Sequence, residues 1–212
     1  MQILVITGGI GSGKSEVCRI LKETYACGVY NADEKVKSLY DTHQTLLSDI
    51  ENALGTILKD DEGRFLPSLL AERIFSDRMQ LELVESMVFP VLVKDFYEWM
   101  QDYKDDSFVV FESATILEKP QFIGFGDCTV LVKAPYDLRL SRAAERDGSR
   151  VDAEARMSRQ VLMNRLSEGG EDERIDFVLD NSGSMDELER KIRDLVAKVT
   201  DNTNVTYIQH GC

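Results

Sequence analysis

The stretch "ITGGIGSGKSE" at residues 6–16 joins an apolar run to a helical pattern and decides the fold of this chain. It matches the spacing G-x-x-x-x-G-K-[ST] through Gly8, Gly13, Lys14 and Ser15. Glycines let the main chain turn its N–H groups inward, because no Cβ then blocks a polyphosphate. A helix predicted over residues 14–25 adds the partial positive charge of its N-terminus. Residues 8–15, here called the phosphate loop, therefore predict a nucleoside triphosphate site.

The phosphate loop also predicts which residues contact the nucleotide. We expect ATP to be bound by Gly9, Gly11, Ser12, Gly13, Lys14 and Ser15. Lys14 is predicted to bridge the β- and γ-phosphates, and the Ser15 hydroxyl to bind Mg²⁺. The alternative is a glycine-rich turn with an exposed lysine, which is disfavoured because residue types, spacing and context agree. The loop by itself does not identify the phosphate acceptor.

Five short apolar runs predict β-strands, and the first of them leads into the phosphate loop. They lie near residues 3–7, 29–31, 108–112, 129–134 and 176–181. The runs are mostly apolar rather than alternating, which is typical of strands buried on both faces. Helical patterns lie between them, so we predict an α/β fold with a three-layer, doubly wound, parallel five-stranded sheet. In such folds the ligands bind beyond the carboxyl ends of the strands.

Two regions between the strands are predicted to be helical. Residues 41–104 contain no convincing strand, show helical periodicity and are too long for a loop, so we interpret them as a helical insertion. Residues 136–168 form two helical segments joined at Gly148 and rich in arginine, an arrangement that predicts a lid able to exclude water. We expect residues 1–212 to form one domain.

Charge and cysteine content limit the partners and the compartment. The chain has 25 Lys and Arg against 38 Asp and Glu, a formal charge of −13, which argues against binding nucleic acid or an anionic membrane through overall charge. Its apolar runs are far shorter than a membrane span. The four cysteines show no CxxC pair, so we expect reduced thiols in the cytoplasm. The oligomeric state stays open.

The segment "RLSRAAERDGSR" predicts local capture of an anion. Residues 139–165 contain seven arginines, four acids and no lysine. Arg139, Arg142 and Arg146 are three and four residues apart, which gathers them on one helical face. Guanidinium groups suit phosphate recognition, so we expect Arg142 and Arg146 to contact ATP, with Arg139 as a weaker candidate. The alternative is a helix of solvated ion pairs.

Three further side chains follow predicted strands. Asp33 could take a proton from an acceptor hydroxyl, or it could cap the next helix. Glu112 could support Mg²⁺ through water, or it could be a solvated acid at a strand end. Asn181, in "DNSGS", could contact an adenine, or its segment could form a turn with Ser184 capping the last helix.

Together these residues resemble the dephospho-CoA kinase family. The resemblance runs over about residues 1–199 through "TGGIGSGKS", "NADE", "RLSRAAERDG", "RMSRQ" and "DFVLDNSGSMDELERKI". It implies a P-loop kinase fold of the nucleoside-kinase type, with a substrate-binding helical insertion and an arginine-rich lid. It also implies that ATP with Mg²⁺ phosphorylates the ribose 3′-hydroxyl of dephospho-CoA, the last step of coenzyme A synthesis. By this resemblance Asp33 is the catalytic base and Arg142 the lid arginine, acting with Lys14.

Three positions depart from the family pattern, and two other functions stay open. Asn31 stands where the family has Asp, Phe89 precedes proline where the family has His, and "ATILE" with Glu118 replaces a Pro-Leu-Leu segment. A kinase for another nucleoside, nucleotide or small hydroxyl compound would use the same loop and lid. A nucleotide-dependent switch is the non-enzymatic alternative, and the arginine-rich lid and Asp33 argue against it.

Overall fold

The computed structural model describes residues 1–209, with side chains described except at residues 75, 76 and 201–209. The chain divides into two compact units. The core unit comprises Met1–Tyr30 and Tyr103–Cys212, and the insertion unit comprises Asn31–Asp102. The predicted helical insertion lies largely within the insertion unit, which begins earlier than expected, at Asn31.

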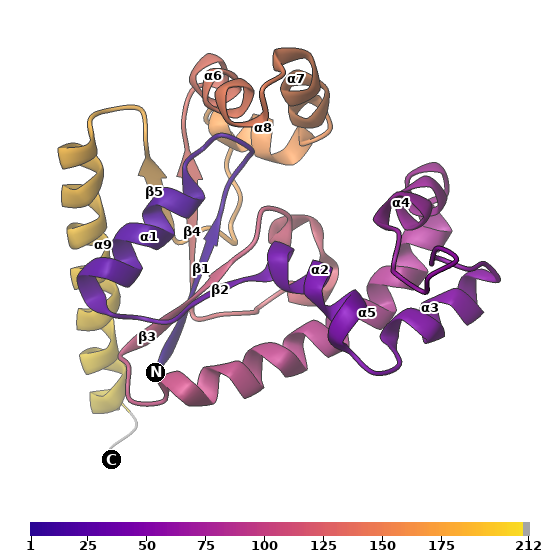
Figure 1. Cartoon of the computed structure of the whole chain (residues 1–212). Coiled ribbons are helices and arrows are strands. Elements are labelled where there is room, and N and C mark those ends of the chain that lie inside the picture. Colours follow the sequence, from indigo (N-terminus) through magenta and orange to yellow (C-terminus); the bar gives the residue numbers. More distant parts are fainter. Residues whose placement is uncertain (210–212) are drawn as a thin grey trace. The chain divides into compact units, whose positions relative to one another are not determined.

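The predicted strands are confirmed, and each end lies within one residue of its predicted position. The strands are β1 Gln2–Thr7, β2 Val29–Asn31, β3 Phe108–Glu112, β4 Cys128–Lys133 and β5 Phe177–Asp180. They form one five-stranded sheet in the order β2-β3-β1-β4-β5 (Figure 1). The pairs β1–β3, β1–β4 and β4–β5 are parallel. The phosphate loop therefore leaves the central strand of the sheet at its carboxyl edge.

Side chains from both faces of the sheet are buried, as the apolar runs predict. On one face, α1 (Lys14–Tyr25) and α9 (Met185–Gln209) pack against the strands, with Val17 and Ile192 fully buried (Figure 1). On the other face, Phe111 packs against Phe122 and Phe125, with ring centroids 5.9 and 4.7 Å apart. Burial on both faces holds β1 in place, and β1 fixes where the phosphate loop begins.

The arginine-rich lid contains three helices where the sequence predicts two. They are α6 Tyr136–Asp147, α7 Arg150–Ser158 and α8 Val161–Ser167. The prediction of one continuous second helix is wrong, because the chain breaks at Gln160, whose ψ is 60°. There the Met157 carbonyl accepts from the Gln160 N–H at 3.0 Å and also from the Asn164 side-chain amide at 2.8 Å. Leu140, Ala153 and Met157 form the buried contact within the lid.

The insertion unit is helical, with a separate apolar interior. Its helices are α2 Ala32–Thr42, α3 Leu46–Leu54, α4 Pro67–Ser76 and α5 Arg78–Trp99. Ile50 and Phe96 are fully buried, and the Tyr40 and Phe65 rings lie 4.8 Å apart. Phe96 is the buried aromatic of this interior among the described side chains, whereas Tyr97 on the same helix is 45% exposed. Asp77 begins α5 by accepting hydrogen bonds from the Met79 and Gln80 N–H groups.

The described residues bear on two expectations, the lack of a membrane span and the presence of reduced thiols. Over residues 1–209, no helix has both the length and the apolar content needed to cross a membrane. Cys18, Cys27 and Cys128 are buried free thiols, and burial raises the pKa of Cys27 to about 11 and that of Cys128 to about 12. Cys212 lies outside the described residues.

Candidate functional site

The phosphate loop folds tightly where β1 passes into α1. Gly13 begins α1 with a φ of 94°, a left-handed conformation that favours glycine. A Cβ at Gly13 would also lie 2.1 Å from the Asn181 amide nitrogen, so no larger residue fits without displacement. The Ser12 N–H donates to the Gly9 carbonyl at 3.1 Å, and the Ser12 side chain is fully buried. Sequence and structure thus agree on a compact bend that carries the first turn of a helix.

The ammonium group of Lys14 lies over the loop that precedes it. Its Nζ donates to the Gly8 carbonyl at 2.9 Å and to the Gly9 carbonyl at 3.4 Å. These contacts hold a positive charge at the N-terminus of α1, where the helix dipole also attracts an anion. The arrangement is suited to binding phosphate oxygens.

The two predicted metal-binding residues contact each other. The Ser15 hydroxyl donates to Glu112 Oε1 at 3.1 Å, although 97 residues separate them. Glu112 is only 6% exposed, so its interpretation as a solvated acid at a strand end is wrong. Burial and the Glu112 carboxylate together raise the pKa of the neighbouring Cys18 thiol.

A hydroxyl and a carboxylate are hard oxygen ligands, which fit Mg²⁺ when substrate phosphates and waters complete its shell. Among the described residues, no group of three or more His, Cys, Asp or Glu could hold a metal ion. Ser15 Oγ and Glu112 Oε1 are hard oxygen ligands of the kind that fits Mg²⁺, and they lie 3.1 Å apart.

Asn181 joins the end of β5 to the phosphate loop. Its side-chain amide donates to the Ser12 carbonyl at 2.9 Å, and its own carbonyl accepts from Arg142 Nη1 at 3.1 Å. The predicted turn and cap after it are confirmed, because the Glu187 N–H donates to Ser184 Oγ at 3.3 Å. Contact between Asn181 and a base stays a prediction, whereas its bond to the loop is a role that the sequence did not reveal.

The three arginines predicted on one face of α6 lie in different surroundings. Arg139 is completely buried beneath the loop, whereas Arg142 is half-buried beside Asn181. Arg146 is exposed on the same helix, with 59% of its side chain accessible. Arg142 is thus the arginine nearest to Gly13, where a Cβ would lie 4.0 Å from its Nη1. The spacing correctly places all three on one helix, but the three side chains differ in how deeply they are buried.

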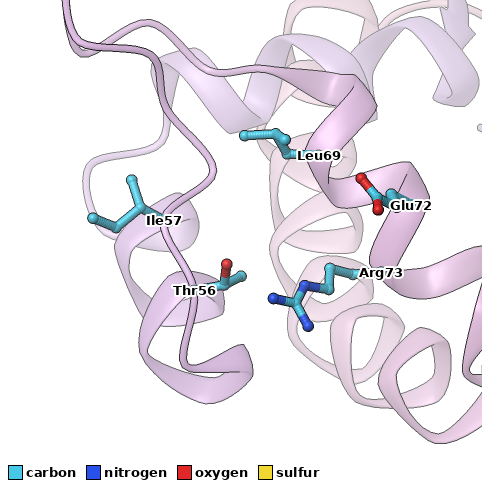
Figure 2. Close-up of a pocket in the computed structure, with 5 residues that line it drawn as sticks. All are labelled: Thr56, Ile57, Leu69, Glu72 and Arg73. Carbon is cyan, nitrogen blue, oxygen red and sulfur yellow. The ribbon is translucent and has the colours of Figure 1, made fainter.

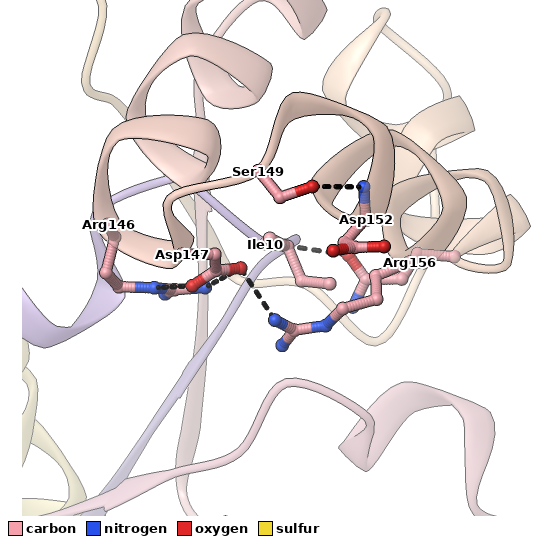
Figure 3. A network of polar contacts seen from close by, with 7 residues as sticks. Ile10, Arg146, Asp147, Ser149, Asp152 and Arg156 are labelled. Carbon is pink, nitrogen blue, oxygen red and sulfur yellow. Dashed lines mark hydrogen bonds and ion pairs between the residues drawn. The ribbon is translucent and has the colours of Figure 1, made fainter.

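Arg146 takes part in an ion-pair network between α6 and α7 (Figure 3). Its Nε donates to Asp147 at 2.7 Å, and Arg156 Nη1 donates to the same carboxylate at 2.7 Å. The Arg146 guanidinium holds the pKa of Asp147 below its usual value. Ser149 begins α7 by accepting from the Asp152 N–H. The predicted contact of Arg146 with ATP stays a prediction, since its partner here is Asp147.

Gln160 is a site residue that composition and spacing did not identify. Its Oε1 accepts a hydrogen bond from the Ile10 N–H at 2.7 Å, which ties the lid to the loop. The Ile10 side chain packs against the buried cluster of the lid. The only signal for it was the family segment "RMSRQ", which ends at this residue.

Asp33 belongs to the insertion unit, so its part in the site stays a prediction. It lies exposed in the first turn of α2, and Asn31 caps that helix by accepting from the Glu34 N–H at 3.0 Å. The interpretation of Asp33 as the cap is therefore wrong. Asn31, one of the departures from the family pattern, has a clear local role instead.

The insertion unit also contains an open pocket of about 240 Å³ between the end of α3 and α4 (Figure 2). Its lining is Thr56, Ile57, Leu69, Glu72 and Arg73. Two aliphatic side chains, a hydroxyl and two opposite charges therefore share this lining.

Comparison with known proteins adds a family assignment. A family model described as "Dephospho-CoA kinase" matches residues 2–187. The dephospho-CoA kinase of Porphyromonas gingivalis is 36% identical over 173 residues, covering 81% of this chain and 84% of that protein. That of Salinibacter ruber is 31% identical over 205 residues, covering 94% and 98%. A solved structure from Thermus thermophilus matches with a TM-score of 0.76 and 28% identity, covering 93% of this chain and 97% of that one.

Proposed function

This chain belongs to the dephospho-CoA kinase family, and on that premise we propose that it transfers the γ-phosphate of ATP to the ribose 3′-hydroxyl of dephospho-CoA. The products are CoA and ADP, and the reaction is the last step of coenzyme A synthesis. The observation that carries the proposal is the family match over residues 2–187, which spans the phosphate loop, the insertion unit and the lid. Kinases for other nucleosides or nucleotides are not favoured by any of the similar proteins described above.

The phosphate loop, Lys14 and Arg142 would bind the triphosphate. Positive charge from Lys14 and from the N-terminus of α1 offsets the charge of the β- and γ-phosphates. Arg142 lies beside Gly13 and can stabilise charge that develops during transfer. We assign additional nucleotide contacts to Arg146 and Asn181.

Ser15 and Glu112 would hold Mg²⁺ through their side-chain oxygens. Bound there, the metal would neutralise negative charge that develops on the phosphates. The hydrogen bond between the two residues supports this assignment, because it brings both oxygens to one place. Glu112 is fixed by burial at the end of β3, so its carboxylate needs little ordering on binding.

Asp33 would act as the general base toward the acceptor. Its carboxylate takes the proton of the 3′-hydroxyl as the bond from that oxygen to the γ-phosphorus forms. The bond between the γ-phosphorus and the β–γ bridging oxygen breaks, and the electron pair leaves with ADP. The exposed position of Asp33 in the first turn of α2 leaves its carboxylate accessible to a substrate. The helical insertion, residues 41–104, would supply further contacts to the acceptor.

We assign the enzyme to the cytoplasm, with small molecules as substrates and neither nucleic acid nor membrane as a partner. The buried free thiols support a reducing compartment, and the charge of −13 supports the absence of a polyanionic partner.

The test is an ADP-release assay with Mg²⁺-ATP and, in parallel, dephospho-CoA, adenosine, AMP or no acceptor. We expect release with dephospho-CoA alone and a product phosphorylated at the 3′ position. Release with adenosine or AMP instead would overturn the choice of acceptor and retain a kinase. Release that needs no acceptor would point to the nucleotide-dependent switch.

A further inference from the structure

Arg139 is the largest fully buried side chain of the protein among the described residues, and it lies directly under the phosphate loop. Its Nε donates to the Ile10 carbonyl at 3.0 Å, and its Nη1 donates to Ser167 Oγ at 3.0 Å. Loop residue Ile10 and Ser167 at the end of α8 are thus joined by one guanidinium. Since Gln160 binds the Ile10 N–H, both main-chain groups of Ile10 are engaged by the lid.

The guanidinium also sets the closest approach of the loop to α6. A Cβ at Gly9 would lie 2.2 Å from Arg139 Nη2, and a Cβ at Gly11 would lie 2.1 Å from the Arg139 carbonyl oxygen. Two glycines of the loop therefore rest on this one residue. A side chain at Gly11 would push the loop off α6, because it would meet main chain, whereas a side chain at Gly9 would displace the Arg139 guanidinium. Close packing on Arg139 thus constrains both positions in addition to any contact with a ligand.

The charge of Arg139 is not balanced within the described part of the chain. None of the described carboxylates lies within ion-pair distance of it. Of the two acidic groups that act on it, the Tyr136 phenol has the greater effect and is neutral at physiological pH, and the other is the exposed carboxylate of Glu168. Its Nη2 is buried and has no hydrogen-bond partner among the described residues. Burial lowers the pKa of Arg139, but a guanidinium stays protonated at any physiological pH.

A buried cation without a counter-ion is costly unless something else supplies negative charge. A hydrophobic side chain of similar size would pack under the loop without that cost. The loop above Arg139 is the place where a polyphosphate is proposed to bind, and interactions through a low-dielectric interior are strong.

We propose that Arg139 is a positioning residue for nucleotide binding, a buried cation that holds the loop in its binding shape and whose charge is balanced by a bound polyphosphate. The inference rests on the nucleotide-binding part of the proposed function. It requires no contact between Arg139 and the nucleotide, because the guanidinium acts through the loop that it supports. It also makes affinity depend on the number of phosphates, which a purely structural role would not.

The test is calorimetric binding of ATP, ADP and AMP to three variants, with folding checked by circular dichroism. Arg139→Met removes charge and donors, Arg139→Gln removes charge but keeps an amide donor, and Arg139→Lys keeps the charge. We expect the Met and Gln variants to bind ATP about tenfold more weakly, with smaller losses for ADP and about twofold or less for AMP. Arg139→Lys should stay within about threefold of wild type. Arg19→Met, which removes an exposed charge from α1, is the matched control and should bind ATP normally.

Equal losses for ATP and AMP, or a lysine variant as weak as the methionine variant, would overturn the proposal and leave a structural role. A second measurement needs no stable variant: the buried Arg139 Nε–H resonance of the wild type should shift on adding ATP and much less on adding AMP. An identical response to both nucleotides would also overturn it. Because binding is measured without an acceptor, an enzyme that binds ATP but ignores dephospho-CoA would refute the proposed function while leaving this inference in place.

Discussion

The core unit and the insertion unit present their functional groups in different ways. In the core unit, Glu112 is 6% exposed, Asn181 is 7% exposed, and both are hydrogen-bonded to the phosphate loop or its helix. In the insertion unit, Asp33 and the pocket residue Arg73 lie exposed on helices. The difference teaches that the residues proposed to bind ATP are buried in the core unit, whereas the proposed base lies on the surface of a helix in the insertion unit.

Lys14→Ala should give the largest effect, because it removes the cation that the core unit holds at the start of α1. We expect kcat/KM to fall by about 10³-fold or more, as for other cations that act on a transferred phosphate. The thermal midpoint should change little, since Lys14 is only partly buried. Steady-state kinetics with dephospho-CoA measure the loss. Lys22→Ala, exposed on the same helix, is the control, and an equal loss there would contradict a specific role.

Asp33→Asn should distinguish the proposed role of the insertion unit from that of the core unit most clearly. We expect kcat to fall by about 10²–10³-fold, the usual contribution of a general base, with ATP affinity unchanged. Kinetics and ATP calorimetry on the same preparation test both parts. Glu34→Gln, which removes the neighbouring charge in the first turn of α2, should retain activity. Full activity in folded Asp33→Asn would refute the base assignment.

Glu112→Gln, a change in the core unit, should have an intermediate effect on the rate. We expect the Mg²⁺ concentration for half-maximal rate to rise by about tenfold, because the buried carboxylate is lost while the Ser15 hydroxyl remains. Excess Mg²⁺ should then restore most of the rate. A rate that is equally low at every Mg²⁺ concentration would indicate that Glu112 acts on folding instead.

The smallest effect concerns the stability of the insertion unit and its pH dependence. Burial would raise the pKa of Glu51, but the Leu58 N–H and the Lys59 ammonium, at 2.8 and 3.0 Å, lower it below 4.5. The carboxylate therefore stabilises the fold fully above pH 4.5, and this contribution is lost as the pH falls through the lowered pKa. Glu51→Gln should cost about 1 kcal/mol near neutral pH.

Thermal unfolding of wild type and Glu51→Gln, at neutral pH and in acid, measures this difference. The gap between the two proteins should close in acid, because the wild-type carboxylate is then protonated. Glu62→Gln, whose carboxylate is exposed, is the control and should match wild type throughout. A gap that persists in acid would assign the effect to packing rather than charge.

Much of the fold was predictable because its signals are local in the sequence. Apolar runs marked all five strands, and the spacing around Gly8, Lys14 and Ser15 marked the loop. The break between α7 and α8 was not predictable, since the hydrogen bond from Asn164 to Met157 that accompanies it appears only in the folded lid.

The site was predictable in its residue types but less so in its contacts. Helical spacing grouped the arginines of α6, yet it does not reveal which of them is buried, because burial depends on what the fold places opposite. Arg139 thus lies under the loop and Arg146 on the surface. Nothing local in the sequence indicated that Asn181 and Gln160 bind the main chain of the loop.

The hydrogen bonds that anchor the phosphate loop also constrain the order in which the site is assembled during translation. Ile10 is held by Arg139, 129 positions later, and Ser12 by Asn181, 169 positions later. The loop therefore leaves the ribosome well before either of its supports. A nascent chain therefore carries the nucleotide motif long before it has a nucleotide site, and chains interrupted before β5 would lack the anchor that the Asn181 amide supplies to the loop.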